Sequence, residues 1–276
     1  MLSTILANTV HQLMSRLAMN KPVRDWRNQR VWIIGASSGI GAALGQRLLA
    51  VGANVILSAR RTVLLEQVAA HHASALVLAL DVQDESAWKA GYKTIQDKFS
   101  GVDFIIFCAA DYCPERCWEV VPEMAWRTLK INLASVYSGL ATVLPEMIRQ
   151  GQGGIGLVAS AAGYMGLPNA SVYGPSKAAL INLSEILYGD LHPKGINVYL
   201  INPGFVATGL TQKNSFYMPA LITAQQAAES ILRGFAIGQF EIHFPRRFTQ
   251  VVKLVRLLPY PLRFYLFKRL FYDPLQ

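Results

Sequence analysis

The stretch that most limits how this chain can fold is a short apolar strand that leads into a glycine-rich turn and then a helix. Val31–Ile34 has the composition of a buried strand, and the next seven residues contain three glycines. An amphipathic helical pattern follows and ends at Gly52. This order of elements points backbone N–H groups at a pyrophosphate. The turn therefore predicts a dinucleotide site with contacts from Gly35, Ser37, Ser38, Gly39, Ile40 and Gly41.

The rest of the chain repeats the alternation of strand and helix. After 31–34, further strands are predicted at residues 54–58, 75–80, 103–109, 155–159, 196–201 and 239–244, with helical segments between them, the longest over residues 122–149. Alternating units of this kind form a doubly wound parallel sheet with right-handed crossovers. The predicted fold is a single-domain, seven-stranded α/β sheet of the Rossmann type.

Length and composition set the domain boundaries. The chain has 276 residues and a hydrophobic content of 52%, with no internal repeat and no Pro/Ser-rich linker. We therefore expect one catalytic domain over residues 31–245, an N-terminal amphipathic extension over 1–30 and a C-terminal helical extension over 246–276.

The residues after the second strand indicate which dinucleotide binds. An acid at this point bonds the ribose 2′-hydroxyl of NAD, whereas an arginine accommodates the 2′-phosphate of NADP. Here Arg60 and Arg61 follow Ala59, and no acid is near. We predict NADP(H), with Arg60 as the main contact and Ser37 or Ser38 assisting. The alternative is that one or both arginines are merely solvated.

Ser160, Tyr173 and Lys177 form a candidate catalytic group. Tyr173 and Lys177 lie one helical turn apart and share a face. A cation beside a phenol favours the phenolate, so we predict that Lys177 lowers the pKa of Tyr173 and fits it for proton exchange with an alcohol or ketone. Ser160 ends a predicted strand, where open α/β sheets bind their ligands.

Taken together, these motifs resemble the short-chain dehydrogenase/reductase family over about residues 31–245. The resemblance lies in the glycine turn, Asp81, Asn132, Ser160, Tyr173-x-x-x-Lys177, and Pro203-Gly204 with Thr208, all in the family's order. One departure is Cys108-Ala109-Ala110-Asp111, where the family often has Asn-Asn-Ala-Gly after the fourth strand.

The resemblance implies roles for individual residues. Tyr173 would donate the proton in ketone reduction, Ser160 would hold the carbonyl oxygen, and Lys177 would also bond the nicotinamide ribose. Asn132 would position a water that links Lys177 to solvent. The remaining cofactor contacts implied are Asp81 and Val82 at the adenine, Ala109 after the fourth strand, and Pro203, Gly204, Val206 and Thr208 beside the nicotinamide. The family also implies pairing through two long helices, as a homodimer or a tetramer.

The net charge of +9 is concentrated at the two ends of the chain. Residues 1–30 hold five Lys/Arg and one Asp, and residues 246–276 hold seven Lys/Arg and one Asp. This distribution argues against a nucleic-acid groove across the domain. Cys108, Cys113 and Cys117, without a nearby histidine, indicate ordinary thiols of a reducing compartment, and no metal site is predicted.

Three readings stay open for the N-terminal end and two for the C-terminal end. Residues 1–19 carry an apolar helical stripe that fits a helix packed on the domain or at a membrane surface, with a transit peptide as a third reading. In residues 246–276, a basic amphipathic helix broken at Pro259 precedes an aromatic-rich basic segment. That pattern is typical of an anionic membrane surface or of an arm packed on protein. No run of apolar residues is long enough to predict a spanning helix.

The predicted function is NADP-dependent hydride transfer to or from a lipophilic ketone or secondary alcohol, in the cytoplasm or peripherally at a membrane. Two loops, with Tyr164, Met165 and Leu167 and with Phe205, Leu210, Phe216, Tyr217 and Met218, should frame an apolar substrate, and only Lys213 there carries a charge. Reduction of 3-oxoacyl thioesters and a non-catalytic, membrane-tethered NADP-binding scaffold or redox sensor are the alternatives.

Overall fold

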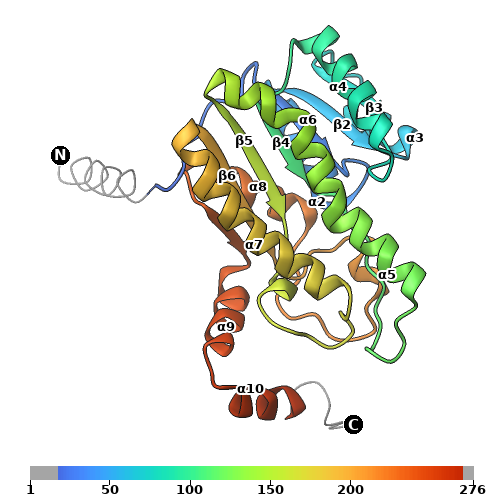
Figure 1. The fold of residues 1–276 in the computed structure, drawn as a ribbon, viewed down its shortest axis with the longest axis vertical. Helices are drawn as coiled ribbons and strands as arrows, with labels where there is room; N and C mark the ends of the chain where they lie inside the picture. Colours follow the sequence, from blue (N-terminus) through green and yellow to red (C-terminus); the bar gives the residue numbers. More distant parts are fainter. Residues whose placement is uncertain (1–17, 270–276) are drawn as a thin grey trace, which may run out of the picture.

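In a computed structural model, which describes residues 18–269, the chain forms one seven-stranded sheet in the order β3-β2-β1-β4-β5-β6-β7, with every neighbouring pair parallel (Figure 1). The predicted fold class is confirmed. The strands are β1 Arg30–Ile34, β2 Asn54–Ala59, β3 Ala75–Ala79, β4 Phe104–Phe107, β5 Gly153–Val158, β6 Ile196–Pro203 and β7 Glu241–Phe244.

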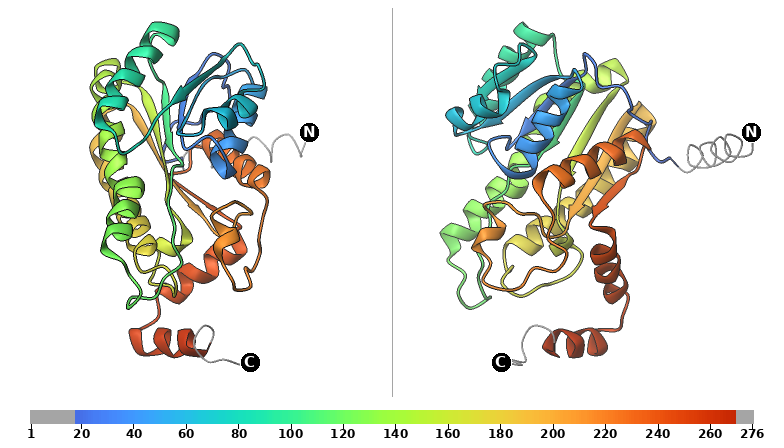
Figure 2. Two further views of the ribbon diagram at one scale, coloured as in Figure 1. Left: turned by 90° about the vertical axis from the view of Figure 1, so that its right-hand side faces the viewer. Right: turned by 180° about the vertical axis from the view of Figure 1, so that it is seen from behind.

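Helices cover both faces of the sheet in two layers (Figure 2). One layer holds α2 Gly39–Ala50, α3 Thr62–Ala69 and α8 Ala224–Ala236. The other holds α4 Glu85–Phe99, α5 Pro122–Leu129, α6 Ser135–Gln150 and α7 Tyr173–Leu191. Two capping motifs begin these helices as the sequence dictates: Asp84 accepts from two N–H groups of α4, and Thr223 and Gln226 form a capping box at α8.

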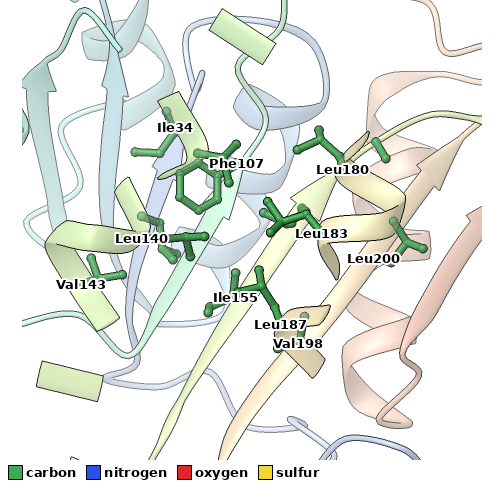
Figure 3. Packing of buried hydrophobic residues seen from close by; sticks show 14 of the residues in the cluster. Ile34, Phe107, Leu140, Val143, Ile155, Leu180, Leu183, Leu187, Val198 and Leu200 are labelled. Carbon is green, nitrogen blue, oxygen red and sulfur yellow. The ribbon is translucent and has the colours of Figure 1, made fainter. Parts of the chain in front are cut away.

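Each layer has its own core because successive residues of a strand point to opposite faces. Trp32 and Ile34 of β1 enter the core under α4, α6 and α7, whereas Val31 and Ile33 enter the core under α2, α3 and α8. In the first core, Leu140 and Val143 approach Phe107 and Ile34 from one side, and Leu183 and Leu187 approach Ile155 from the other (Figure 3). The alternating side chains of β1 thus contribute to the cores on both faces of the sheet.

The predicted helix over residues 122–149 differs from the observed one in a single turn. The turn Lys130–Ala134 is a π-helix (η1) between α5 and α6, so the segment holds a residue more than regular α-helical winding accommodates. Asn132 lies in that turn.

Within the described residues, this segment, Pro122–Gln150, is the single helix long and apolar enough to span a bilayer, with a mean hydropathy of 1.2. Val136, Leu140 and Val143 from it lie in the core, so it is a core helix of the fold.

Two helices follow the last strand and extend beyond the sheet. These are α9 Arg246–Arg256 and α10 Tyr260–Phe267, separated at Pro259 as predicted (Figure 1). The buried side of α9 holds Thr249 and Val252, with Lys253 half-buried in an ion pair with Glu241. Much of its apolar side remains exposed. Of the N-terminal helix predicted over residues 1–19, residues 1–17 lie outside the described residues.

Candidate active site

A cavity of about 440 Å³ opens where the strands end. Parallel strands bring the loops after β1, β2, β4, β5 and β6 to the same edge. Every predicted catalytic or cofactor-binding residue lines this cavity, with the exception of Asn132, whereas the two predicted substrate loops contribute only Leu210 and Lys213. Residues that the sequence reasoning did not single out complete the wall, among them Asp111, Ile131 and Thr211.

The glycine turn and the start of α2 form one end of the cavity. Gly35 has a φ of +90°, and a Cβ at this position would lie 2.5 Å from the backbone nitrogen of Ala109, so glycine is required for the turn to approach the end of β4. Ser38, at the N-cap of α2, makes no side-chain capping bond, and the first turn holds no acid. The N–H groups at this helix end are therefore suited to a pyrophosphate.

Arg60 and Arg61 are both exposed at the same end of the cavity. The guanidinium of Arg61 donates to Ser37 Oγ at 2.9 Å and to Ser38 Oγ at 3.0 Å. Arg61 is thus the arginine held over the two serines, while the assignment of Arg60 as the main cofactor contact stays a prediction. A positive site thus faces the position where the ribose of a dinucleotide would lie.

Tyr173 begins α7 and lies beside Ser160, which follows β5. Burial raises the pKa of Tyr173 to about 12, and a hydrogen bond with Ser160 opposes this rise. The prediction that Lys177 lowers this pKa is therefore wrong for the chain alone, because desolvation dominates. At neutral pH the phenol keeps its proton and can donate it.

Lys177 is fully buried one turn along α7. Its Nζ donates to the Val158 carbonyl at 2.8 Å and lies 5.5 Å from the centroid of the Tyr173 ring. Burial lowers the pKa of Lys177 to about 8. A glycine makes this packing possible, since a Cβ on Gly163 would lie 2.7 Å from the Lys177 carbonyl carbon. The loop after Ser160 thus rests directly on the backbone of Lys177.

We expect Lys177→Met to stabilise the protein at neutral pH, although it removes a site residue. The native pKa of about 8 lies below the unfolded value of 10.5, so folding must expel a proton or bury a charge at pH below 8. The difference of about 2.5 between the two pKa values corresponds to about 3 kcal/mol at neutral pH, offset by about 1 kcal/mol for the lost bond to Val158.

The advantage of the variant should shrink as the pH rises from about 8 to about 10, because the wild type then regains stability. Denaturant unfolding of both proteins at several pH values measures this. A difference that does not change with pH would contradict the assigned burial of the charge.

Asn132 fixes the segment after β4 rather than lining the cavity. Its amide donates to the Asp111 carbonyl at 2.9 Å and to Ser176 Oγ at 3.0 Å, and its Oδ1 accepts from the Asp111 N–H at 2.7 Å. Ser176 in turn donates to the Tyr173 carbonyl at 2.7 Å. From the π-helical turn, the Asn132 side chain therefore bonds both Asp111 of the cavity wall and Ser176 in the first turn of α7. Ser176 was missed, although it adjoins Lys177 in the sequence.

Tyr112, which sequence reasoning also missed, packs against Tyr173 from the segment after β4. Its ring lies edge-on to Tyr173 with the centroids 5.0 Å apart, and its hydroxyl donates to Asn214 Oδ1 at 2.9 Å. Lys213 donates to the Tyr112 carbonyl. Of the second predicted loop, Leu210 and Lys213 line the cavity, whereas Phe205, Phe216, Tyr217 and Met218 do not.

Tyr164 does not line the catalytic cavity, which corrects the prediction for the first loop. It is buried, and its hydroxyl donates to Glu241 Oε1 at 2.6 Å. It belongs instead to a second cavity beside α9, with Glu241, Lys253 and Leu257.

Comparisons with known proteins agree with this geometry. The family model described as short chain dehydrogenase matches residues 29–216. An uncharacterized oxidoreductase of Myxococcus xanthus is 30% identical over 234 residues, which cover 83% of this chain and 92% of the relative. Serine 3-dehydrogenase of Rhizobium radiobacter is 34% identical over 183 residues, or 66% of this chain and 73% of the relative.

Solved structures share the fold. A short-chain dehydrogenase from Sphingobium yanoikuyae in complex with NADPH has a TM-score of 0.73 and 24% identity, and covers 81% of this chain and 92% of its own. One from Burkholderia phymatum in complex with NAD has a TM-score of 0.77 and 21% identity, over 84% and 94%. The fold and the site thus define an oxidoreductase of the dinucleotide-binding α/β class. The chain belongs to the short-chain dehydrogenase/reductase family, whose members use NAD(P).

Proposed function

We propose that this protein is an NADP-dependent oxidoreductase that reduces a lipophilic ketone, or oxidises the matching secondary alcohol, with Tyr173 as the proton donor. The observation that carries the proposal is the meeting of Ser160, Tyr173 and Lys177 in the cavity that the glycine turn also lines. The bound nicotinamide would supply the hydride.

The chain's own residues would supply the proton and the orientation. Tyr173 is protonated at neutral pH and shares a hydrogen bond with Ser160, so both hydroxyls can converge on one carbonyl oxygen. Lys177 would hold the ribose and maintain positive charge near the phenol. Asn132 would act as a positioning residue through Asp111 and Ser176.

The preference for NADP is supported by charge at one end of the cavity. Arg60 and Arg61 stand where a 2′-phosphate would lie, and no acid there would bind the ribose of NAD. The hydroxyls of Ser37 and Ser38 already hold Arg61, so its guanidinium is oriented before a ligand arrives.

The proposed substrate class is supported by the partners of the charged side chains on the substrate side of the cavity. Lys213 donates to the Tyr112 carbonyl, and Asp111 lies 3.5 Å from Arg127. Both ions have partners within the protein, and Leu210 lines the same cavity as the catalytic group. A substrate with its own charge would have to displace these contacts.

The test is oxidation of NADPH with a panel of carbonyl compounds. We expect long-chain aliphatic ketones such as decanone to be reduced with a higher kcat/KM than ketones that carry a carboxylate. A 3-oxoacyl thioester in the same panel tests the second enzyme reading. A clear preference for the carboxylates would overturn the substrate class but not the reaction.

We also propose assembly as a homodimer through α6 and α7. Tyr137, Ile148 and Ile186 are exposed apolar side chains on these two helices, and apolar patches of this kind mark interfaces.

A further inference from the structure

The helices α9 and α10 form a surface that is both apolar and positively charged, which we call the arm surface. Seven large apolar side chains on and between the two helices are exposed, with Leu257 at 79%, Tyr260 at 65% and Leu254 at 64%. The others are Val251, Leu262, Phe264 and Tyr265. Large contiguous exposure of this kind marks a site of interaction with a membrane or a protein.

The charge of the arm surface selects between those partners. Residues 246–269 contain seven Lys/Arg and no Asp or Glu. One of the cations, Lys253, pairs with Glu241 of β7. Arg263 lies 4.3 Å from the centroid of the Tyr260 ring, and Arg269 lies 5.8 Å from that of Tyr265. Cations interleaved with aromatic rings, without acids, complement an anionic lipid surface, whereas self-association would bring like charges together.

The arm surface lies at the end of the sheet where the catalytic cavity opens. The helix α9 leaves from the C-terminal end of β7, and α10 lies beyond the loops at that end (Figures 1 and 2). The loops after β4 and β6 carry two further exposed aromatics at this end, Trp118 at 77% and Tyr217 at 85%.

Contacts between α9 and the loops of the domain hold this half of the arm surface against the domain. A Cβ on Gly204 would lie 2.8 Å from the ring of Phe248, whose centroid is 5.4 Å from that of Phe205. The carboxylate of Glu241 binds Lys253 of α9 and Tyr164 of the loop after Ser160. One face of α9 is thereby attached to the loop after β6, which lines the catalytic cavity, and to the loop after Ser160.

We propose that the arm surface docks the protein onto an anionic lipid bilayer, with the opening of the catalytic cavity turned toward the lipid. The docking stands on the arm residues alone. Its purpose, entry of a lipophilic ketone or alcohol from the bilayer, depends on the proposed function.

The test is co-sedimentation of the full chain with vesicles, without cofactor or substrate. We expect binding to phosphatidylcholine vesicles that contain phosphatidylglycerol and little binding to phosphatidylcholine alone. Arg256→Glu with Lys268→Glu should weaken the partition at least about 30-fold, since each basic residue near the surface contributes about fivefold. Leu257→Asp should also weaken it, because the side chain is exposed and the fold does not depend on it.

Matched control variants distinguish an effect of the arm surface from the effects of overall charge and of stability. Lys89→Glu with Lys93→Glu makes the same charge change on exposed positions of α4, and Val63→Asp introduces an acid at a 65% exposed position of α3. Both should bind like the wild type.

Several outcomes would overturn the docking proposal. Equal binding to both vesicle types would do so, and so would binding that survives the arm variants. A third such outcome is a wild-type protein that does not bind vesicles but forms a dimer that Leu257→Asp disrupts. Turnover of a water-soluble ketone without vesicles should be unaffected by the arm variants. Absent turnover would refute the proposed function and leave the docking intact.

Discussion

Tyr173→Phe is expected to lower kcat by about 10²–10⁴-fold while NADPH still binds with wild-type affinity. The change removes one hydroxyl from a ring whose apolar contacts, including the edge-on contact with Tyr112, are preserved. The proton that the substrate oxygen needs then has no donor at that position. Single-turnover oxidation of NADPH, followed with fluorescence titration of the cofactor, measures both quantities.

Tyr112→Phe is the matched control, because it removes the neighbouring hydroxyl from the same aromatic pair. It breaks the bonds to Asn169 and Asn214, so it should change KM more than kcat. Turnover that survives in Tyr173→Phe would exclude this tyrosine as the proton donor. A wild type that binds NADPH but reduces no carbonyl compound would instead support the scaffold alternative.

The second large effect is expected for cofactor choice. Replacing both Arg60 and Arg61 by alanine should weaken NADPH binding about 100-fold and change NADH binding little, because charge-assisted hydrogen bonds to a phosphate contribute about 1.5–3 kcal/mol each. The single changes rank the two residues. Since Ser37 and Ser38 hold Arg61 in place, Arg61→Ala should cost more than Arg60→Ala.

Titration of both cofactors into the three variants decides the matter. Arg47→Ala, which removes a half-exposed arginine on α2 that lies near Glu229, is the control and should leave both affinities unchanged. Equal losses for NADPH and NADH would show that the arginines act on a part common to both cofactors. Unchanged NADPH affinity would mean that they are only solvated.

The fold was predictable because its signals are local. Strand and helix periods alternate without interruption, and the carboxyl ends of parallel strands must share an edge, which brings Ser160 and the glycine turn together. The order of the motifs then located the catalytic and cofactor-binding part of the cavity wall apart from Asn132, but not the residues on the substrate side. The direction of the pKa shifts could not be predicted. The spacing places Lys177 beside Tyr173, but the pKa values of both groups depend on how completely the side chains are removed from water.

Other details depend on partners that are distant in sequence. The orientation of Tyr164 follows from Glu241, 77 residues away, and the same carboxylate attracts Lys253 and turns the polar side of α9 inward. The π-helical turn around Asn132 adds one residue to a pattern that otherwise fits a continuous helix. Helical periodicity identifies the polar and the apolar face of a helix such as α9, but it does not predict which of the two faces packs on the domain.

The attachment of the residues before β1 has a consequence for orientation. Asn20 bonds the carbonyls of Val198 and Gln239, so the chain enters the domain at the amino ends of β6 and β7, whereas α9 leaves β7 at its carboxyl end. The described cations before and at the start of β1, which are Lys21, Arg24, Arg27 and Arg30, therefore lie at the opposite pole of the domain from α9. A flat bilayer that contacts α10 cannot at the same time contact the opposite pole, where residue 18 lies. The positive charges at the two poles therefore cannot bind to one membrane surface together.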